Sequence, residues 1–425
     1  MIETIFALSS GAPPAAVAVI RISGPRARSA LQALCGRLPA PRRASLATLR
    51  AQDGEALDQA LVLWMPGPAT ATGEDMAELQ CHGGRAVVAR LLAELAGFAG
   101  FRPAAAGEFT LRAFANGRID LAEAEGLADL LSAETELQRR AAIELAGGRW
   151  SALIDSWRER VLLASAEVEA VLDFADEDDG AALSDDFTAR LTALRQELED
   201  WLAQPRAEML REGFRVVIAG PPNAGKSTLF NALVEDEAAI IAPLAGTTRD
   251  VLTRPVAIEG IPFVFVDTAG LRDGTQDAIE AIGIERARGA AAGADLVLWL
   301  GPTAGAPPAS WDIAAQADRV DGCHKTAPRH RLSALTGEGM AGLRSDLART
   351  ARGAMPRPGR AALNARQHRL VGAAAEALGA AASGGDGLLI AEELRRARAA
   401  FDALLGRTAT EDMLDTLFAR FCIGK

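Results

Sequence analysis

The stretch Phe214-Arg-Val-Val-Ile-Ala-Gly-Pro-Pro-Asn-Ala-Gly-Lys-Ser-Thr228 decides the fold of the central part of this 425-residue chain. Its apolar first half predicts a buried strand, and its second half fits the pattern G-x-x-x-x-G-K-[ST] from Gly220 to Ser227. In such a loop the backbone N–H groups surround phosphates, and the positive end of the following helix adds to their attraction. An ordinary glycine-rich turn is disfavoured, because both flanks have the pattern that the motif requires. We therefore expect a nucleoside triphosphate site.

The loop assigns roles to particular side chains. Lys226 would reach the β- and γ-phosphates, and the Ser227 hydroxyl would ligate Mg²⁺. The contacts to the nucleotide predicted here are Asn223, Ala224, Gly225, Lys226, Ser227 and Thr228.

Two downstream segments narrow the nucleotide to GTP. In Ala245-Gly-Thr-Thr-Arg-Asp250, Thr248 can close over Mg²⁺ as a switch, and such segments order when a γ-phosphate is present. Phe263-Val-Phe-Val-Asp-Thr-Ala-Gly270 is a strand that ends in Asp267, which is placed to hold the Mg²⁺ shell through water. The order and spacing of the three motifs predict a GTPase and resemble the Era-like branch of the translation-factor GTPases. The further predicted GTP contacts are Ala242, Pro243, Leu244, Ala245, Gly246, Thr247, Thr248, Asp267, Thr268, Ala269 and Gly270.

The guanine pocket departs from the usual N-K-x-D sequence. Its best match is Ala315-Gln-Ala-Asp318, in which Asp318 can still accept hydrogen bonds from guanine. The asparagine that ties the loop together is lost, and Gln316 replaces the lysine that would stack on the base. Ser333, Ala334 and Leu335 match the segment that supports the base. The connector Gly301–Asp312 is too short and too rich in Pro and Gly for a full crossover helix. We therefore expect weakened guanine affinity and selectivity.

Composition excludes several classes of protein. The formal charge of −11 and the pI of about 5.1 argue against a generally basic nucleic-acid binder. The four cysteines have no CxxC spacing, so the sequence implies neither zinc nor a disulfide framework. There is no basic segment at the start and no apolar run of about 18 residues, so we expect a cytoplasmic protein without a membrane span.

Pattern changes divide the chain into four segments. Residues 1–116 mix short β-type runs with a helical run and predict a compact α/β domain. Residues 117–212 are helical, residues 213–352 form the G domain, and residues 353–425 return to a helical pattern. The expected fold is therefore multidomain, with an α/β N-terminal domain and a helical domain interrupted by an inserted Ras-like P-loop G domain.

Six further motifs are spread along the whole chain. They are Val19-Ile-Arg-Ile-Ser-Gly24, Glu78-Leu-Gln-Cys-His-Gly-Gly84, Gly107-Glu-Phe-Thr-Leu-Arg112, Asn116-Gly-Arg-Ile-Asp-Leu-Ala-Glu-Ala-Glu125, Asp173-Phe-Ala-Asp-Glu177 and Phe421-Cys-Ile-Gly-Lys425. With these motifs the chain closely resembles the MnmE (TrmE) family of tRNA modification GTPases.

The resemblance implies one-carbon chemistry on tRNA. The N-terminal domain would dimerise and bind a tetrahydrofolate derivative, in the 5,10-methylene or 5-formyl form, through Arg21, Glu78, Arg118 and Lys425. Arg118 departs from the family, which often has lysine there. Cys422 would act at the one-carbon unit, whereas the alternative reading is a small apolar side chain that packs the last helix. With a flavin-dependent partner, MnmG, in a heterotetramer, the homodimer would add a carboxymethylaminomethyl or aminomethyl group to carbon 5 of wobble uridine.

The resemblance also implies how GTP is hydrolysed. Leu271 follows Asp267-Thr-Ala-Gly270 where Ras-like proteins place a glutamine, so another group must compensate. In this family K⁺ takes the place of an arginine finger, and its expected ligands here are Asn223, Ala242, Leu244 and Thr247. Glu280 would position the attacking water, with Asp277 as a weaker alternative. The competing function is a regulatory or ribosome-associated GTPase without one-carbon chemistry.

Overall fold

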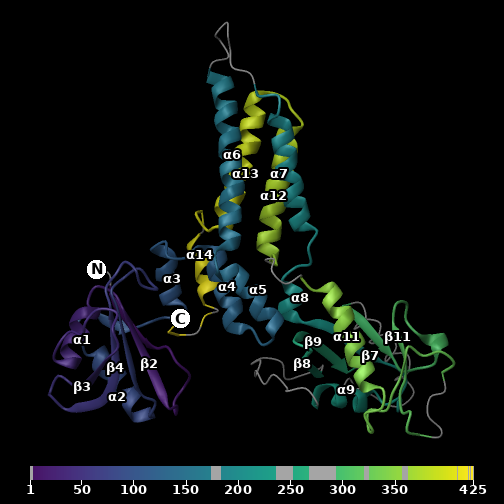
Figure 1. Cartoon of the computed structure of the whole chain (residues 1–425), viewed down its shortest axis with the longest axis horizontal. Coiled ribbons are helices and arrows are strands. Elements are labelled where there is room, and N and C mark those ends of the chain that lie inside the picture. Colours follow the sequence, from purple (N-terminus) through teal and green to yellow (C-terminus); the bar gives the residue numbers. More distant parts are fainter. Residues whose placement is uncertain are drawn as a thin grey trace. The chain divides into compact units, whose positions relative to one another are not determined.

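The computed structural model describes residues 3–173, 183–235, 252–267, 293–319, 325–356, 362–408, 410–419, 421 and 423–424. Contacts divide the chain into two compact units (Figure 1), of which the first contains residues 1–128, 151–155 and 402–425. The second contains residues 129–150 and 156–401. The boundaries of the four segments expected from the sequence remain predictions.

The first unit is built on a sheet in the order β3-β4-β5-β2-β1-β6. Its strands pair antiparallel except for β6, which runs parallel to β1. Side chains along β2 point alternately to the two faces of the sheet. Ile20 and Ile22 are buried beneath α1 and α2, and Arg21 faces the other side. On that other side, Phe109 of α3 packs on Ile5 and Ala7. The elements are β1 (Thr4–Leu8), β2 (Val17–Ser23), α1 (Ala27–Cys35), β3 (Ser45–Arg50), β4 (Ala56–Met65), β5 (Met76–His82), α2 (Arg85–Ala96), β6 (Phe101–Pro103) and α3 (Glu108–Ala115).

The end of the chain belongs to this first unit. Phe418, at the end of α14 (Glu411–Phe418), packs with Phe421 against Ala124 of α4 (Leu121–Ser132). Beyond it, Ile423 forms a β-bridge with Ala106. Gly424 has a φ of 93° and lies so close to β1 that a Cβ atom there would clash with the carbonyl oxygen of Leu8. Gly424 therefore lies beside the sheet that carries Arg21.

The second unit contains the sheet that the opening motif predicts, in the order β12-β11-β10-β7-β9-β8. All its pairings are parallel except that of the edge strand β8. Helices α9 and α11 bury one face, where Leu229 and Leu347 join the strand residues Ile218 and Phe265. The elements are β7 (Phe214–Ala219), α9 (Lys226–Glu235), β8 (Leu252–Ile258), β9 (Ile261–Asp267), β10 (Leu296–Trp299), β11 (Trp311–Ala314), β12 (His330–Arg331) and α11 (Met340–Ala354). The predicted P-loop fold is confirmed.

The connector between β10 and β11 contains only a short 3-10 turn at Thr303–Gly305, as its composition predicts. The Trp299 indole N–H donates to the carbonyl of Pro302 at 2.8 Å, and the Thr303 hydroxyl donates to Asp312 at 2.7 Å. Lys325, whose side chain is buried, also pairs with Asp312. These contacts fix the connector without a crossover helix.

Long helices make up the rest of the second unit, with α6, α7, α12 and α13 side by side (Figure 1). Their core includes the rings of Trp150, Trp157, Trp201 and Phe401. Among the described residues, no helix is both long enough and apolar enough to cross a bilayer. The bounds are α5 (Glu136–Ala146), α6 (Arg149–Asp173), α7 (Phe187–Leu202), α8 (Glu208–Glu212), α12 (Ala365–Ala382) and α13 (Gly387–Leu404).

Candidate functional site

The loop that follows β7 has the backbone geometry of an anion site. Asn223 and Gly225 have φ values of 61° and 90°, so left-handed residues curl the chain just before α9 begins at Lys226. Successive N–H groups in such a curl form a concave nest for anions, and the helix dipole adds positive potential. Ser227 and Thr228 lie exposed in the first turn of the helix. The described loop therefore suits a chain of phosphates.

Lys226 is folded back over this loop. Its side chain is nearly buried, and Nζ donates to the carbonyl of Pro221 at 2.8 Å. A buried ammonium group needs polar partners, and a phosphate oxygen is a stronger acceptor than a carbonyl. A phosphate in this loop would therefore replace the Pro221 carbonyl as an acceptor for the Lys226 ammonium.

The predicted guanine-recognition loop, residues 315–318 (the base loop), contacts the segment that is expected to support the base. Asp318 Oδ1 accepts a hydrogen bond from the buried Ser333 hydroxyl at 2.5 Å, and Ala317 N–H donates to the carbonyl of Leu332 at 3.1 Å. The hydrogen bond from Ser333 lowers the pKa of Asp318, which keeps the carboxylate charged. Leu335 is exposed. The structure thus brings Asp318 and the segment Ser333–Leu335 together on one side of the loop.

Sequence reasoning missed one contact of this loop. Gln316 Nε2 donates to the carbonyl oxygen of Asn223 at 3.1 Å, so a side chain still ties the base loop to the P-loop. The sequence shows that the motif asparagine is lost, but it does not show that the following residue reaches the neighbouring loop.

Several predicted site residues cannot be placed. Asp267 is described only through its backbone, at the end of β9. Outside the described residues lie Ala242, Pro243, Leu244, Ala245, Gly246, Thr247, Thr248, Thr268, Ala269, Gly270, Glu280, Cys422 and Lys425.

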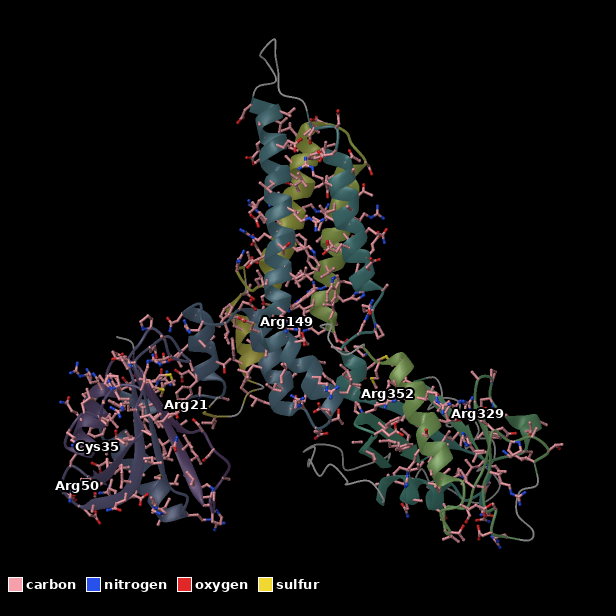
Figure 2. All side chains as sticks on the ribbon, viewed as in Figure 1. Arg21, Cys35, Arg50, Arg149, Arg329 and Arg352 are labelled. Carbon is pink, nitrogen blue, oxygen red and sulfur yellow. The ribbon has the colours of Figure 1, made fainter. Side chains whose placement is uncertain are left out.

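In the first unit, Arg21 and Glu78 form a cross-strand pair on β2 and β5. Arg21 donates from Nε and Nη2 to Glu78 Oε1 at 3.0 and 2.9 Å. Its guanidinium carbon lies 5.9 Å from the centre of the Phe109 ring. Both polar side chains are partly exposed, 26% for Arg21 (labelled in Figure 2) and 17% for Glu78. A ligand that reaches this face would meet a carboxylate and a guanidinium group held in fixed positions.

Arg118 is held by a different loop. Its Nε donates to the carbonyl of Thr70 at 3.2 Å, and Asn116 Nδ2 donates to that of Thr72 at 2.7 Å. Gly73, with a φ of 79°, lets the two loops approach closely, since a Cβ atom there would lie 2.8 Å from Cβ of Asn116. The described contacts join Arg118 to this loop rather than to Arg21 or Glu78.

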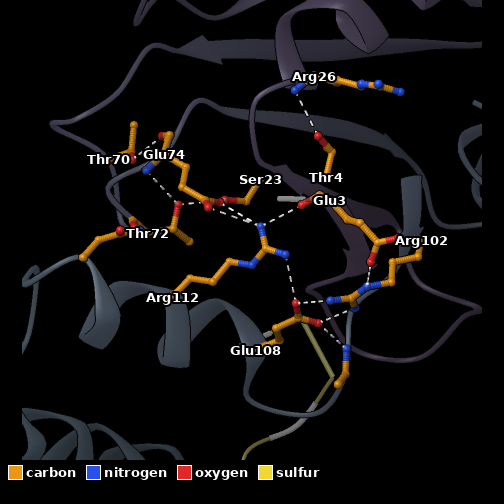
Figure 3. A network of polar contacts seen from close by, with 12 residues as sticks. Glu3, Thr4, Ser23, Arg26, Thr70, Thr72, Glu74, Arg102, Glu108 and Arg112 are labelled. Atoms are coloured by element: carbon orange, nitrogen blue, oxygen red, sulfur yellow. Dashed lines mark hydrogen bonds and ion pairs between the residues drawn. The ribbon is translucent and has the colours of Figure 1, made fainter. Parts of the chain in front are cut away.

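A network of charged side chains fixes that loop to the sheet (Figure 3). Arg112 donates to Glu74 Oε2 at 3.0 Å and to Glu108 Oε1 at 3.0 Å, and Ser23 donates to Glu74 at 2.7 Å. Arg102 completes the network with hydrogen bonds of 2.6 and 2.7 Å to Glu108. The i,i+4 spacing of Glu108 and Arg112 signals their pairing in the sequence. Nothing local signals Glu74, which comes from a distant loop.

Glu108 is the most strongly perturbed acid of this network. Burial would raise its pKa, but hydrogen bonds from Arg102, from the N–H of Ala105 and from Arg112 outweigh burial and lower the pKa to about 2. The unfolded chain would have a pKa of about 4.3 at this residue. The ionised carboxylate therefore stabilises the fold fully above about pH 4.3, and this contribution is lost as the pH falls toward 2.

Glu108→Gln should destabilise the N-terminal sheet by about 1–3 kcal/mol at pH 7, because it removes charged hydrogen bonds. The difference from wild type should shrink at pH 3.5. The free energy of unfolding is measured by denaturant series at both pH values. Each sample is pulse-labelled by hydrogen exchange at a common pH, and the protection of β1 and α3 is read out. Glu55→Gln, an exposed acid, is the control. An unchanged stability at pH 7 would contradict the assigned role.

The second unit defines the class of protein. It has a largely parallel sheet, a phosphate loop after β7 and, after β11, a guanine-recognition loop that carries Asp318. These features are those of a P-loop GTPase. Comparison with known proteins gives the family. Residues 4–118 match the profile "GTP-binding protein TrmE N-terminus", and residues 121–422 match "MnmE helical domain". The chain belongs to the MnmE family of tRNA modification GTPases, which confirms the predicted family, fold class and enzyme class.

The similar proteins include full-length relatives. The "tRNA modification GTPase MnmE" of Erythrobacter litoralis is 60% identical over 423 residues, and that of Novosphingobium aromaticivorans is 61% identical over 438. Each alignment covers 100% of both chains. Among solved structures, the G domain of the T. maritima FeoB iron transporter covers 32% of this chain and 98% of its own, with 22% identity and a TM-score of 0.24.

Proposed function

We propose that this chain is the GTP-hydrolysing, tetrahydrofolate-binding component of the complex that adds a carboxymethylaminomethyl or aminomethyl group to carbon 5 of wobble uridine in tRNA. The observation that carries the proposal is the position of the C-terminal tail. Ile423 bridges to Ala106, and Gly424 lies against Leu8 of β1, in the same sheet that holds Arg21 and Glu78. A pure G-domain switch would have no need for this arrangement. The relatives' printed name supplies the tRNA.

The N-terminal residues fit the chemistry of a folate. The Glu78 carboxylate can accept hydrogen bonds from the N–H groups of a pteridine, and Arg21 holds that carboxylate in place. Arg118, and Lys425 from the tail, would add positive charge for the glutamate end. A bound 5,10-methylene- or 5-formyl-tetrahydrofolate would supply the one-carbon unit.

The nucleotide residues fit GTP with two cations. Ser227 and Thr248 would hold Mg²⁺, and Asn223, Ala242, Leu244 and Thr247 would hold K⁺. The exposed amide of Asn223, on a left-handed turn, has the oxygen ligand that such a cation prefers. Glu280 would orient the attacking water. MnmG would be the flavin-dependent partner, and the cytoplasm, where tRNA is found, would be the location.

A homodimer is supported by the outer face of the first sheet. Val17, Leu46 and Leu61 are 54%, 66% and 44% exposed. Leu46 lies opposite Leu61, and Leu61 lies opposite Gln80 on the next strand. Gln80 is two residues from Glu78 and therefore on the same face, so the apolar strip borders the Arg21–Glu78 pair. Exposed apolar strips of this kind are typical of interaction surfaces. A second copy of this chain would cover the strip and enclose the folate residues.

Glu78→Gln should weaken the binding of 5-formyl-tetrahydrofolate to the full chain by about 10- to 100-fold, because a charged acceptor is lost. Isothermal titration measures this, with Glu55→Gln as the matched acid-to-amide control and GDP affinity as the check on the G domain. Wild-type protein that fails to bind the folate would contradict the proposal and favour the regulatory GTPase without one-carbon chemistry.

A further inference from the structure

We propose that Gln316 is a positioning residue of the nucleotide site, which fastens the base-recognition loop to the P-loop turn at Asn223. It replaces the tie that the missing motif asparagine would provide. The proposal concerns the established GTPase site. Only its consequence for cation selectivity rests on the proposed function.

Two contacts place the Gln316 side chain on the P-loop. Its Nε2 donates to the carbonyl oxygen of Asn223 at 3.1 Å. Its Nε2 and Cγ also lie 3.3 and 3.4 Å from where a Cβ atom on Gly225 would stand. The side chain therefore crosses the loop at Gly225, which has no side chain, and a Cβ atom there would press on Gln316.

The backbone of Gln316 is shaped for this reach. Its φ is 60°, and its carbonyl accepts from the N–H of Arg319 at 3.1 Å, so the chain turns sharply just after β11 ends. Left-handed geometry is unfavourable for a residue other than glycine and persists where surrounding contacts hold it. Behind the turn, Ser333 and Leu332 hold Asp318 and Ala317. The base loop is thus anchored on both sides.

Asn223 is the other end of the tie, and its own φ of 61° also needs support. The hydrogen bond from Gln316 goes to the carbonyl of Asn223 and leaves its exposed side chain to face outward. Through this one bond, the position of Asp318 and the conformation of the Asn223 turn depend on each other. A ligand that favours this contact at one site would change the affinity of the other site, and the change would be reciprocal.

Two variants separate the effect of the Gln316 N–H donor from the effect of the side chain's size. Gln316→Met keeps the length but removes the N–H donor, and Gln316→Lys restores a donor of similar reach. For each full-length protein we would measure the Kd of a fluorescent GDP and the rate of GTP hydrolysis in K⁺ and in Na⁺. We expect the methionine variant to bind GDP about 3- to 10-fold more weakly, the effect of one hydrogen bond, and the lysine variant to recover most of this loss.

We also expect the methionine variant to lose part of the ratio between the rates in K⁺ and Na⁺. Unchanged GDP binding in this variant would overturn the proposal, and so would a lysine variant that binds as weakly as methionine. A weakened Kd with a fully preserved rate ratio would overturn the coupling to Asn223. If the parent hydrolyses GTP equally fast in both salts, the proposed K⁺ role fails instead, and the GDP arm still decides the role of Gln316.

Discussion

Replacing Asn223 with alanine should remove the advantage of K⁺ over Na⁺ in GTP hydrolysis and lower turnover in K⁺ by about 10²- to 10³-fold, the effect of losing one preorganised charge-stabilising group. Leu271 stands where a water-positioning glutamine would be expected, and the proposed K⁺ would supply the positive charge that an arginine finger gives in other GTPases. The amide of Asn223 is exposed on the left-handed turn just before Lys226, where its oxygen can hold a cation beside the phosphates.

A matched control separates this role from general damage to the loop. Asn231→Ala removes an exposed amide from α9, on the helix that follows the P-loop, and should leave both rates unchanged. GDP affinity of the Asn223 variant should stay within a few-fold of the parent. Equal rates of the parent in K⁺ and Na⁺, at protein concentrations that permit dimerisation, would contradict the cation assignment.

Cys422→Ser should abolish wobble-uridine modification while GTP turnover and folate binding persist. The residues on either side of Cys422 are anchored in the first unit: Phe421 is buried with Phe418, and Ile423 bridges to Ala106. A nucleophilic thiol must be available as thiolate. Burial raises the pKa of Cys35 to about 11 and also raises that of Cys81, so these two thiols stay protonated and do not suit the role.

Cys35→Ser is therefore the control, since it removes a thiol from the same unit and should retain modification. Mass spectrometry of nucleosides from digested tRNA gives the readout, with the flavoprotein partner present. Modification at the normal rate by the Cys422 variant would reject a catalytic role. Loss of folate binding would instead return this residue to the packing of the tail.

The sequence predicts most of the second unit, because its information is local. The strand at Phe214–Ala219, the helix that begins at Lys226 and the connector without a helix follow from apolar runs, a glycine spacing and Pro/Gly content. The pairing of Asp318 with Ser333 follows from two recognisable segments. The hydrogen bond from Gln316 to Asn223 could not be predicted in this way, because it depends on left-handed backbone at both residues, which neither residue type requires.

The N-terminal site is less predictable from local patterns. Arg21 and Glu78 are 57 positions apart, and only the strand register brings them together. Glu74 reaches Arg112 from a loop, and the side-chain amide of Asn116 binds that same loop at Thr72. Such contacts are set by tertiary packing, so local patterns do not predict them, and only the family resemblance indicates Arg21 and Glu78.

Reconstitution from purified components tests whether the modification of tRNA requires both GTP and the folate. This protein, the proposed flavin-dependent partner and unmodified tRNA would be combined, with GTP or the tetrahydrofolate derivative omitted in turn. Mass spectrometry would quantify the modified nucleoside at the wobble position. We expect product only when both are present, and loss of product in the Glu78→Gln variant at limiting folate. Product that forms at the same rate without the folate, or without GTP, would contradict this expectation.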